Sequence, residues 1–190
     1  MKRCVFLSLS LLMAVFIFVG CNNSAPSDET VEELFDISLN KILLYAMYPY
    51  DYAIEKEFTD VEISEEPFDY NGYQNLYSTN LDYNEFVNKY REFFTADMLK
   101  SFLAFFYNID GYLCINYTPD EVYDVEIDNI VISYDDFNGE VYKYSVTYNY
   151  SKNGDMVREC VGDLYIIEEN NDYKISSSSV LNDLLMFTKS

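Results

Sequence analysis

Few side chains in this sequence could perform covalent chemistry. There is no histidine among the 190 residues, whereas Asp and Glu together number 33. Without imidazole, a Ser-His-Asp triad, a Cys-His pair and the usual mixed zinc sites are excluded. Carboxylate pairs can hydrolyse glycosides, but they need a defined separation and one raised pKa. With so many acids, close pairs arise by chance, so the sequence predicts no enzyme activity.

Cofactor and metal motifs are also missing from the sequence. The 6 glycines are scattered among turns and form no loop that could cradle a phosphate. The acidic stretch at residues 135–140 comes nearest to a calcium loop, but it does not match the twelve-residue pattern. A hairpin turn at Asn138-Gly139 explains this stretch better. We therefore expect no cofactor and no bound metal.

Of the four cysteines, Cys4 lies in a predicted N-terminal export signal and Cys21 directly follows it. Lys2 and Arg3 precede an apolar run at residues 5–19, which is the order of a secretory leader. As a helix this run reaches about 22 Å, short of the ~30 Å hydrocarbon core of a membrane. Its end, FVGC at residues 18–21, is similar to the lipobox of bacterial lipoproteins, although Phe18 stands where Leu is usual.

The lipobox predicts the domain organisation and the location. We expect residues 1–20 to be a lipoprotein signal peptide, Cys21 to be lipidated, residues 21–29 to be a flexible tether and residues 30–190 to be a single domain. Two acyl chains suffice for stable anchoring, so the predicted location is the extracytoplasmic face of the cell membrane. Plain secretion and a retained membrane helix are the alternatives.

Cys114 and Cys160 remain after processing, and both lie in apolar, strand-like stretches. In an extracellular protein such a pair can form a disulfide, and closing a loop of that size adds about 4 kcal/mol in the entropy model. Two separate buried thiols are the alternative, which we favour.

Charge is the most unusual feature of the composition. The chain has 12 Lys+Arg against 33 Asp+Glu, and loss of Lys2 and Arg3 with the signal takes the net charge from −21 to −23. Such a chain cannot neutralise phosphates, so nucleic acid is excluded as a partner, and anionic wall polymers should repel the domain. The charge is explained either as a solvated surface or as steering toward a basic protein partner.

Hydrophobic periodicity predicts three helices in the first half of the chain and one at its end. A capping box of Thr30 and Glu33 opens the first helix, and Asp82 and Thr95 cap the next two. The expected elements are helices over residues 31–47, from Asp82 to Phe94, from Thr95 to Phe106 and over 180–187, with an irregular stretch at 51–75 and a short strand at 112–116.

The C-terminal part predicts an antiparallel meander. Apolar and β-branched runs lie at residues 125–134, 141–150, 156–167 and 173–178, separated by Asn-Gly or Asn-Asn pairs typical of hairpin turns. In the second run Tyr142, Tyr144, Val146, Tyr148 and Tyr150 share one face, which we expect to pack on the helices rather than to form an aromatic platform for a sugar or peptide. The predicted fold class is α+β, with N-terminal helices followed by a C-terminal antiparallel β-meander, cystatin-like or NTF2-like in outline.

A succession of short segments between Tyr73 and about Ser178 carries a family resemblance. The segments are YQNLYST at 73–79, YREFFT at 90–95, MLKSF at 98–102, IDGYL at 109–113, PDE at 119–121 and NDYKIS at 171–176. In this order they are similar to the bacterial DL-endopeptidase inhibitor (IseA) family, over more than half of the chain.

The resemblance implies an inhibitor that performs no chemistry of its own. Members of that family restrain cell-wall hydrolases, which are papain-like cysteine peptidases that cut D-glutamyl–diamino-acid bonds in peptidoglycan stems. By this likeness the protein would plug the catalytic groove of a basic hydrolase with the loop that starts at Asp110. Tyr112 and Tyr117 would anchor the loop, and Asp120 and Glu121 would face basic groups of the enzyme. The alternative for this loop is an ordinary solvated connection. The predicted lipid anchor also departs from the soluble form that is familiar in this family.

A second hypothesis fits the same elements. A cystatin-like or NTF2-like lipoprotein would bind a small ligand or an envelope protein partner. An open cone lined by tyrosines would favour this second hypothesis, whereas a filled core with an exposed acidic loop would favour the inhibitor.

Overall fold

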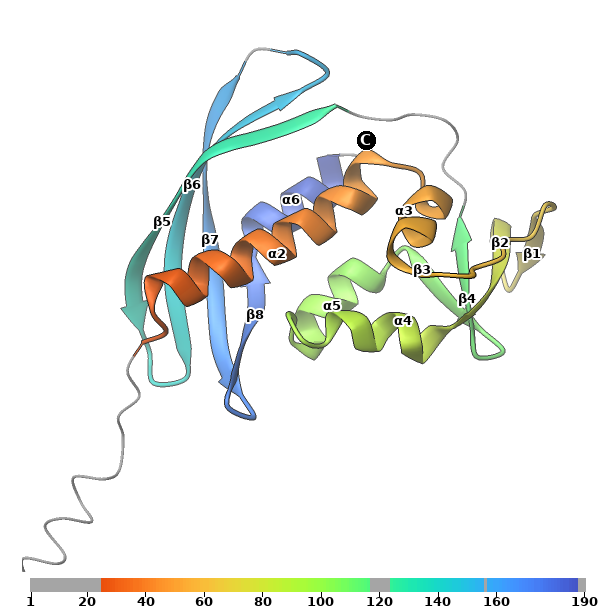
Figure 1. Cartoon of the computed structure of the whole chain (residues 1–190), viewed down its shortest axis with the longest axis horizontal. Coiled ribbons are helices and arrows are strands. Elements are labelled where there is room, and N and C mark those ends of the chain that lie inside the picture. The colour runs from red at the N-terminus through yellow and green to blue at the C-terminus, as the bar shows by residue number, and fades with distance from the viewer. Residues whose placement is uncertain (1–24, 117–123, 156, 188–190) are drawn as a thin grey trace, which may run out of the picture.

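The computed structural model describes residues 25–116, 124–155 and 157–187, and within them five helices accompany two four-stranded antiparallel sheets (Figure 1). The mixed α+β class predicted from the sequence is confirmed. In chain order the elements are α2 (Asp28–Met47), α3 (Tyr50–Glu57), β1 (Phe68–Tyr70), β2 (Tyr73–Asp82), α4 (Tyr83–Tyr90), α5 (Ala96–Leu103), β3 (Phe106–Ile109), β4 (Tyr112–Asn116), β5 (Val125–Phe137), β6 (Val141–Lys152), β7 (Arg158–Glu169), β8 (Asp172–Ser178) and α6 (Ser179–Phe187). None of these helices is long and apolar enough to cross a membrane.

The second sheet has the strand order β5-β6-β7-β8, so consecutive strands pair with one another. Helices α2 and α6 contact each other and lie across one face of this sheet (Figure 1). The predicted alternation along β6 is confirmed, because Tyr142, Tyr144, Val146 and Tyr148 are buried while the residues between them are partly exposed. The aromatic face of β6 therefore packs into the core and is not a platform.

The first sheet has the strand order β1-β2-β4-β3, and α4 and α5 form the connection between β2 and β3. The prediction that residues 51–75 are irregular is wrong, since α3, β1 and the start of β2 lie there. Pro49 is the N-cap of α3. A proline suits a helix start, because its fixed φ matches and its missing N–H has no partner there in any case. The predicted strand at residues 112–116 is confirmed as β4.

Helix caps agree with the prediction at two positions and differ at a third. The Asp82 carboxylate accepts hydrogen bonds from the Asn84 and Glu85 amides at 2.8 and 3.0 Å, and Thr95 caps α5. The capping box expected at Thr30 is wrong, because Ser27 caps α2 and its hydroxyl accepts from the Thr30 amide at 3.2 Å. Two acidic residues then occupy the first turn, where the helix dipole favours them. Residues 28 and 29, which were expected at the end of the tether, therefore belong to the helix.

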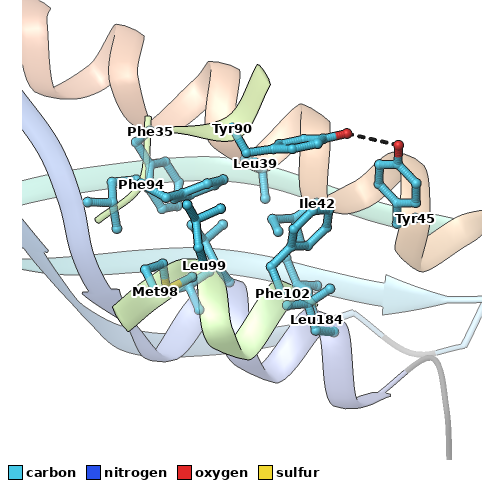
Figure 2. Close-up of a cluster of buried hydrophobic side chains, with 14 of the residues drawn as sticks. Phe35, Leu39, Ile42, Tyr45, Tyr90, Phe94, Met98, Leu99, Phe102 and Leu184 are labelled. Carbon is cyan, nitrogen blue, oxygen red and sulfur yellow. Dashed lines mark hydrogen bonds between the residues drawn. The ribbon is translucent and has the colours of Figure 1, made fainter. Parts of the chain in front are cut away.

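One hydrophobic core joins the helices to both sheets. Figure 2 shows its centre, where aromatic and aliphatic side chains of α2 meet those of α4, α5 and α6. Phe102 lies among these rings, with its ring centroid 4.7 Å from that of Tyr90 and 5.4 Å from that of Tyr45. Each such fully buried side chain contributes about 1.5 to 3 kcal/mol through removal of apolar surface from water.

The segment between α4 and α5 connects the helices to the edge of the second sheet. The Thr95 amide donates to the Ile175 carbonyl at 3.0 Å, and the Ile175 amide donates to the Phe93 carbonyl at 2.8 Å. These bonds pair residues 93–95 with β8, so the two halves of the chain are held together by backbone contacts as well as by the core.

Candidate functional site

The predicted binding loop begins at the turn between β3 and β4. Asp110 and Gly111 both have left-handed backbone angles, with φ of 54° and 91°, as a two-residue hairpin turn requires. The Gly111 amide donates to Asn108 Oδ1 at 3.1 Å, and the Gly111 carbonyl accepts from the Tyr83 amide at 2.9 Å. These bonds fix the turn from two sides and thereby position Tyr112. The other predicted positions lie outside the described residues: Tyr117, Asp120 and Glu121 of the loop, and the lipidation site Cys21.

This turn borders a groove of about 740 Å³ on the outer face of the first sheet. Along β4, Leu113 and Ile115 face the core and are fully buried, whereas Tyr112 and Cys114 line the groove. This alternation is the period-two pattern of a strand between two different environments. Tyr112 is 52% exposed and Cys114 only 2%, so Cys114 lies deep in the groove and Tyr112 at its rim. Hereafter the first-sheet groove means the space lined by Glu62, Phe68, Tyr70, Asp110, Tyr112, Cys114 and their neighbours.

The segment that follows α3 forms one wall of the first-sheet groove. Asn80 of β2 holds this segment in place, because its side-chain oxygen accepts from the Glu62 amide at 2.9 Å and its side-chain nitrogen donates to the Asp60 carbonyl at 3.1 Å. The Ser64 amide also donates to the Ser78 carbonyl at 2.9 Å, and the Ser78 amide donates back to Ser64 Oγ at 3.1 Å. The wall that carries Glu62 is therefore attached to the sheet at several points.

The described residues that line the first-sheet groove include two acids and no Lys or Arg. Neither residues 57–88 nor residues 101–142 contain a Lys or Arg, and these stretches include all four strands of the first sheet. Glu62 and Asp110 line the groove. Burial, followed by the nearby Asp110 carboxylate, raises the pKa of the Cys114 thiol above its usual value.

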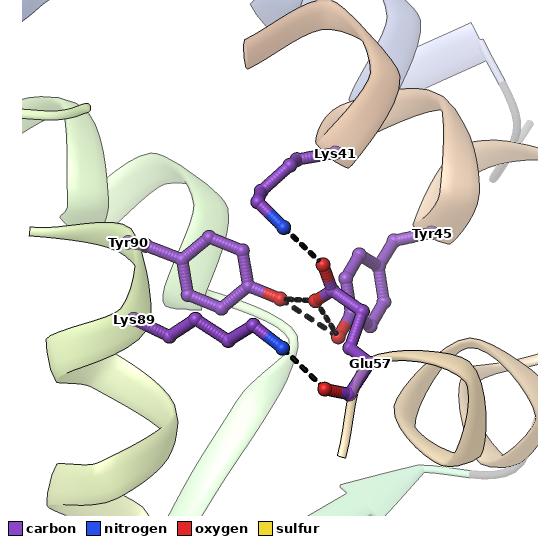
Figure 3. Close-up of polar contacts among 5 residues, drawn as sticks. All are labelled: Lys41, Tyr45, Glu57, Lys89 and Tyr90. Atoms are coloured by element: carbon purple, nitrogen blue, oxygen red, sulfur yellow. Dashed lines mark hydrogen bonds and ion pairs between the residues drawn. The ribbon is translucent and has the colours of Figure 1, made fainter. Parts of the chain in front are cut away.

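A second polar cluster is buried where α2, α3 and α4 meet (Figure 3). The Glu57 carboxylate is its centre: Lys41 Nζ lies 2.5 Å from Oε1, and the hydroxyls of Tyr45 and Tyr90 both donate to Oε2. Lys89 donates to the Glu57 backbone carbonyl. The Glu57 side chain is only 7% exposed. The sequence offered no sign of this cluster, because its members come from three helices and follow no local pattern.

The titration behaviour of the Glu57 cluster agrees with a closed structural site. Burial, with the Glu57 charge as a further cause, raises the pKa of both Tyr45 and Tyr90 well above the ordinary value for tyrosine. Burial also lowers the pKa of Lys89. Both carboxylate oxygens of Glu57 have donors, so this group is committed to holding three helices together rather than to moving a proton of a substrate.

A second depression, of about 580 Å³, lies between α2, the end of α4 and the turn between β7 and β8. Unlike the first-sheet groove, it mixes both signs of charge, with Arg91 and Lys174 close to Glu33 and Glu92. Lys174 Nζ already pairs with Glu169 at 2.8 Å, and Arg91 donates to Asn88 Oδ1 at 2.9 Å. The charge of Lys174 is therefore compensated within the protein, whereas the Asn88 amide that accepts from Arg91 is neutral.

Both cysteines of the described residues are free thiols. Cys114 lies on β4 of the first sheet and Cys160 on β7 of the second. The disulfide considered from the sequence is therefore absent, and the alternative of separate thiols describes the structure, with Cys114 buried and Cys160 partly exposed. Separately, the described residues contain no group of three or more acidic or cysteine side chains that could hold a metal ion.

The interpretation of the candidate site rests on the geometry described above. No protein-family model matches the chain, and no curated protein sequence matches it.

Proposed function

We propose that this protein is a lipoprotein, anchored through Cys21 on the extracytoplasmic face of the cell membrane, that binds and inhibits peptidoglycan DL-endopeptidases. It would occlude the catalytic groove of these papain-like cysteine peptidases and perform no chemistry of its own. The observation that carries the proposal is the acidic, cation-free surface around Asp110 and Tyr112. A basic enzyme domain is the electrostatic complement of such a surface, and an exposed tyrosine on a rigid turn is a common anchor in protein interfaces.

The tyrosine-rich face of β6 supports protein binding over small-ligand binding. An open cone of tyrosines would offer a ligand cavity, but Tyr142, Tyr144 and Tyr148 are buried in the core under α2 and α6. On the outside of the first sheet Tyr70, Tyr73 and Tyr112 are exposed and available to a partner, as is Tyr134 on β5 of the second sheet. A stable inhibitory complex buries roughly 1,600 Å² in total, so the first-sheet groove would be one part of a larger contact.

The arrangement of the acids supports a role without catalysis. Glu57 is the most buried carboxylate among the described ion pairs, and it is saturated by hydrogen bonds from two tyrosines and an ion pair with Lys41. A general acid in a glycosidase would need access to substrate and a second carboxylate at a set distance. The Glu57 cluster offers neither the access nor the partner carboxylate.

The alternative function is that of a cystatin-like or NTF2-like lipoprotein that binds a small ligand or an envelope protein. Its support is the long helix α2 lying across a four-stranded antiparallel sheet, together with the depression of about 580 Å³ beside that helix. The mixed charges there would suit a small zwitterionic ligand. Such a ligand would raise the melting temperature of the protein without affecting any peptidase.

An inhibition assay tests the main proposal. Purified DL-endopeptidase should cleave peptidoglycan more slowly when the mature protein is added, and raising the salt from about 50 to 300 mM should weaken inhibition, because the Debye length shrinks from roughly 14 to 6 Å. The variant Asp110→Asn should inhibit less well than the wild type, whereas Glu159→Gln, which removes an exposed acid of the second sheet, should not differ. Undiminished hydrolysis at a large excess of protein would reject the inhibitor.

The location has its own test. Cells that express the full chain and are fed a labelled fatty acid should label the protein, and the variant Cys21→Ser should not be labelled. Recovery of unlabelled wild-type protein with residues 1–20 still attached would contradict the anchor.

A further inference from the structure

We propose that the first-sheet groove receives a lysine or arginine side chain of the partner protein, with the apolar stem against the groove's aromatic rings and the charged end between Glu62 and Asp110. This inference rests on the proposed binding of a basic protein partner, and it names the part of the partner that enters the groove. It differs from the expectation that the loop 110–121 itself is inserted into the partner.

The walls of the groove match the long stem of a basic side chain. Phe68 and Tyr70 of β1 and Tyr112 of β4 line it, and Tyr70 and Tyr112 are 40% and 52% exposed. Lysine and arginine bury their methylene groups on apolar surface while the head stays near water or a counter-ion. Aromatic faces add a favourable interaction with the cation, of about 0.5 to 1 kcal/mol at an exposed site.

The charges of the groove match the head of the same side chain. Glu62 and Asp110 lie in its lining, and no lysine or arginine is found among the described residues that line it. The structure pairs other acids internally: Lys41 with Glu57, Lys143 with Asp163 and Lys174 with Glu169. The two groove carboxylates have no such partner among the described residues, so an external cation would be their first counter-ion.

The exposed aromatic rings of the groove, like its acids, have no internal cation beside them in the described part of the chain, whereas three other rings have one. The described cation–π contacts all lie on the helical side of the molecule, where Lys89 Nζ is 4.1 Å from the Phe58 ring centroid, Lys56 is 5.1 Å from that of Tyr52 and Lys41 is 5.8 Å from that of Tyr90. Neither Tyr70 nor Tyr112 has an internal cation in the described part of the chain. Both rings are therefore available to a cation from outside.

The groove is also rigid, which lowers the entropic cost of binding. The turn at Asp110 is held by Asn108 and by the start of α4, and the wall at Glu62 is held by Asn80. Groups that are already ordered lose little freedom when a ligand arrives. A preformed acidic and aromatic groove can thus select one basic side chain rather than attract positive charge in general.

Three probes test this assignment on the mature protein: the peptide Ac-Gly-Phe-Lys-Phe-Gly-NH2, the same peptide with norleucine in place of lysine, and free lysine. The lysine peptide should shift the backbone amide resonances of Tyr112 and Cys114. The norleucine peptide should bind at least tenfold more weakly, because it keeps the stem and lacks the charge. Equal affinity of the two peptides would overturn the proposal, as would free lysine binding as tightly as the lysine peptide, since the groove would then take a free small molecule.

Variants localise the effect to the groove. Asp110→Asn removes the charge and keeps the turn, because asparagine tolerates the left-handed backbone angle at this position. We expect it to weaken binding of the lysine peptide about fivefold and Tyr112→Ala to weaken it about tenfold. The matched controls are Glu159→Gln and Tyr134→Ala, an exposed acid and an exposed tyrosine of the second sheet, and they should bind like the wild type. Equal losses in the controls and in the groove variants would overturn the assignment.

The outcomes separate this inference from the proposed function. If the lysine peptide binds the groove but no DL-endopeptidase is inhibited, the groove assignment holds and the inhibitor proposal fails. If inhibition is strong and is unaffected by Asp110→Asn and Tyr112→Ala, the inhibitor proposal holds and the groove assignment fails.

Discussion

The two sheets of this protein use the same residue type in opposite ways. On β6 of the second sheet, Tyr142, Tyr144 and Tyr148 are at most 5% exposed and pack against the helices. On β2 and β4 of the first sheet, Tyr73 and Tyr112 are about half exposed. Burial raises the pKa of Tyr144 and of Tyr148 to about 12, so these two rings stay neutral where an ordinary tyrosine would ionise.

The sheets differ in charge as well. The second sheet carries cations that pair with some of its acids, as when Lys143 lies 3.1 Å from Asp163 and 3.7 Å from Asp135. The strands of the first sheet carry no Lys or Arg at all. The strands of the second sheet carry more acids than cations, but several of these acids lie in ion pairs, and the β6 tyrosines belong to the core. The acids of the first-sheet groove have no ion pair among the described residues, and its tyrosines are exposed, so this surface is where we expect a partner to bind.

Replacing a tyrosine of β6 should have the largest effect. Tyr144→Ala should lower the free energy of unfolding by about 3 to 5 kcal/mol, because it leaves a cavity beneath α2 and α6. Urea denaturation followed by circular dichroism measures this loss. The control is Tyr144→Phe, which should be nearly neutral, since the Tyr144 hydroxyl is buried and has no hydrogen-bond partner. A loss below 1 kcal/mol for Tyr144→Ala would contradict the view of β6 as core.

The Glu57 cluster should have the next largest effect, and it lies on the helical side that supports both sheets. Glu57→Gln should cost about 2 to 3 kcal/mol, since Lys41 then keeps a positive charge in a partly buried place without a partner. Asp97→Asn is the matched control, because its pair with Lys100 is exposed and screened by solvent, so its loss should cost much less than the loss of the buried Glu57 charge. Equal effects of the two substitutions in urea denaturation would show that the cluster is not a structural junction.

Sequence patterns predicted the elements whose signals are local. The caps at Asp82 and Thr95 and the alternation along β6 need only near neighbours, and the structure confirms them. Strand β2 was missed because its buried residues do not follow a simple alternation. The wall of the first-sheet groove was missed because Asn80 holds it through contacts that span about 20 positions of the chain. Distant contacts of this kind cannot be derived from local periodicity.

The residues of the candidate site were likewise predictable only in part. Asp110 and Tyr112 were proposed through the family resemblance, and the turn at Asp110 and Gly111 is confirmed by their left-handed backbone angles. Glu62 and Tyr70 were missed, because only pairing of the strands brings them to the same groove. One signal could have indicated this region: the long stretches without Lys or Arg, which coincide with the first sheet.

A glycine of the second sheet offers a smaller test of its close packing. A Cβ atom at Gly162 would lie 2.6 Å from Val180 Cγ2 and 2.7 Å from Ser179 Oγ, at the start of α6. Gly162→Ala should therefore destabilise the protein by about 1 to 2 kcal/mol through overpacking. Thermal unfolding measures the change, and Ser145→Ala, at a half-buried position of β6, should change stability by less than about 0.5 kcal/mol. Unchanged stability of Gly162→Ala would mean that α6 can move away from β7 without penalty.

The smallest effect on stability should come from the first sheet, and it sharpens the comparison most. Tyr112→Ala removes a ring that is 52% exposed at the rim of the first-sheet groove, so the free energy of unfolding should change by less than about 0.5 kcal/mol. The same substitution should reduce peptidase inhibition about tenfold, because the ring would contact the partner. Tyr144→Phe has the opposite character, with a change inside the core and no change in inhibition expected. A stability loss above 1 kcal/mol for Tyr112→Ala would mean that this face belongs to the core, and the contrast between the sheets would then no longer locate a binding surface.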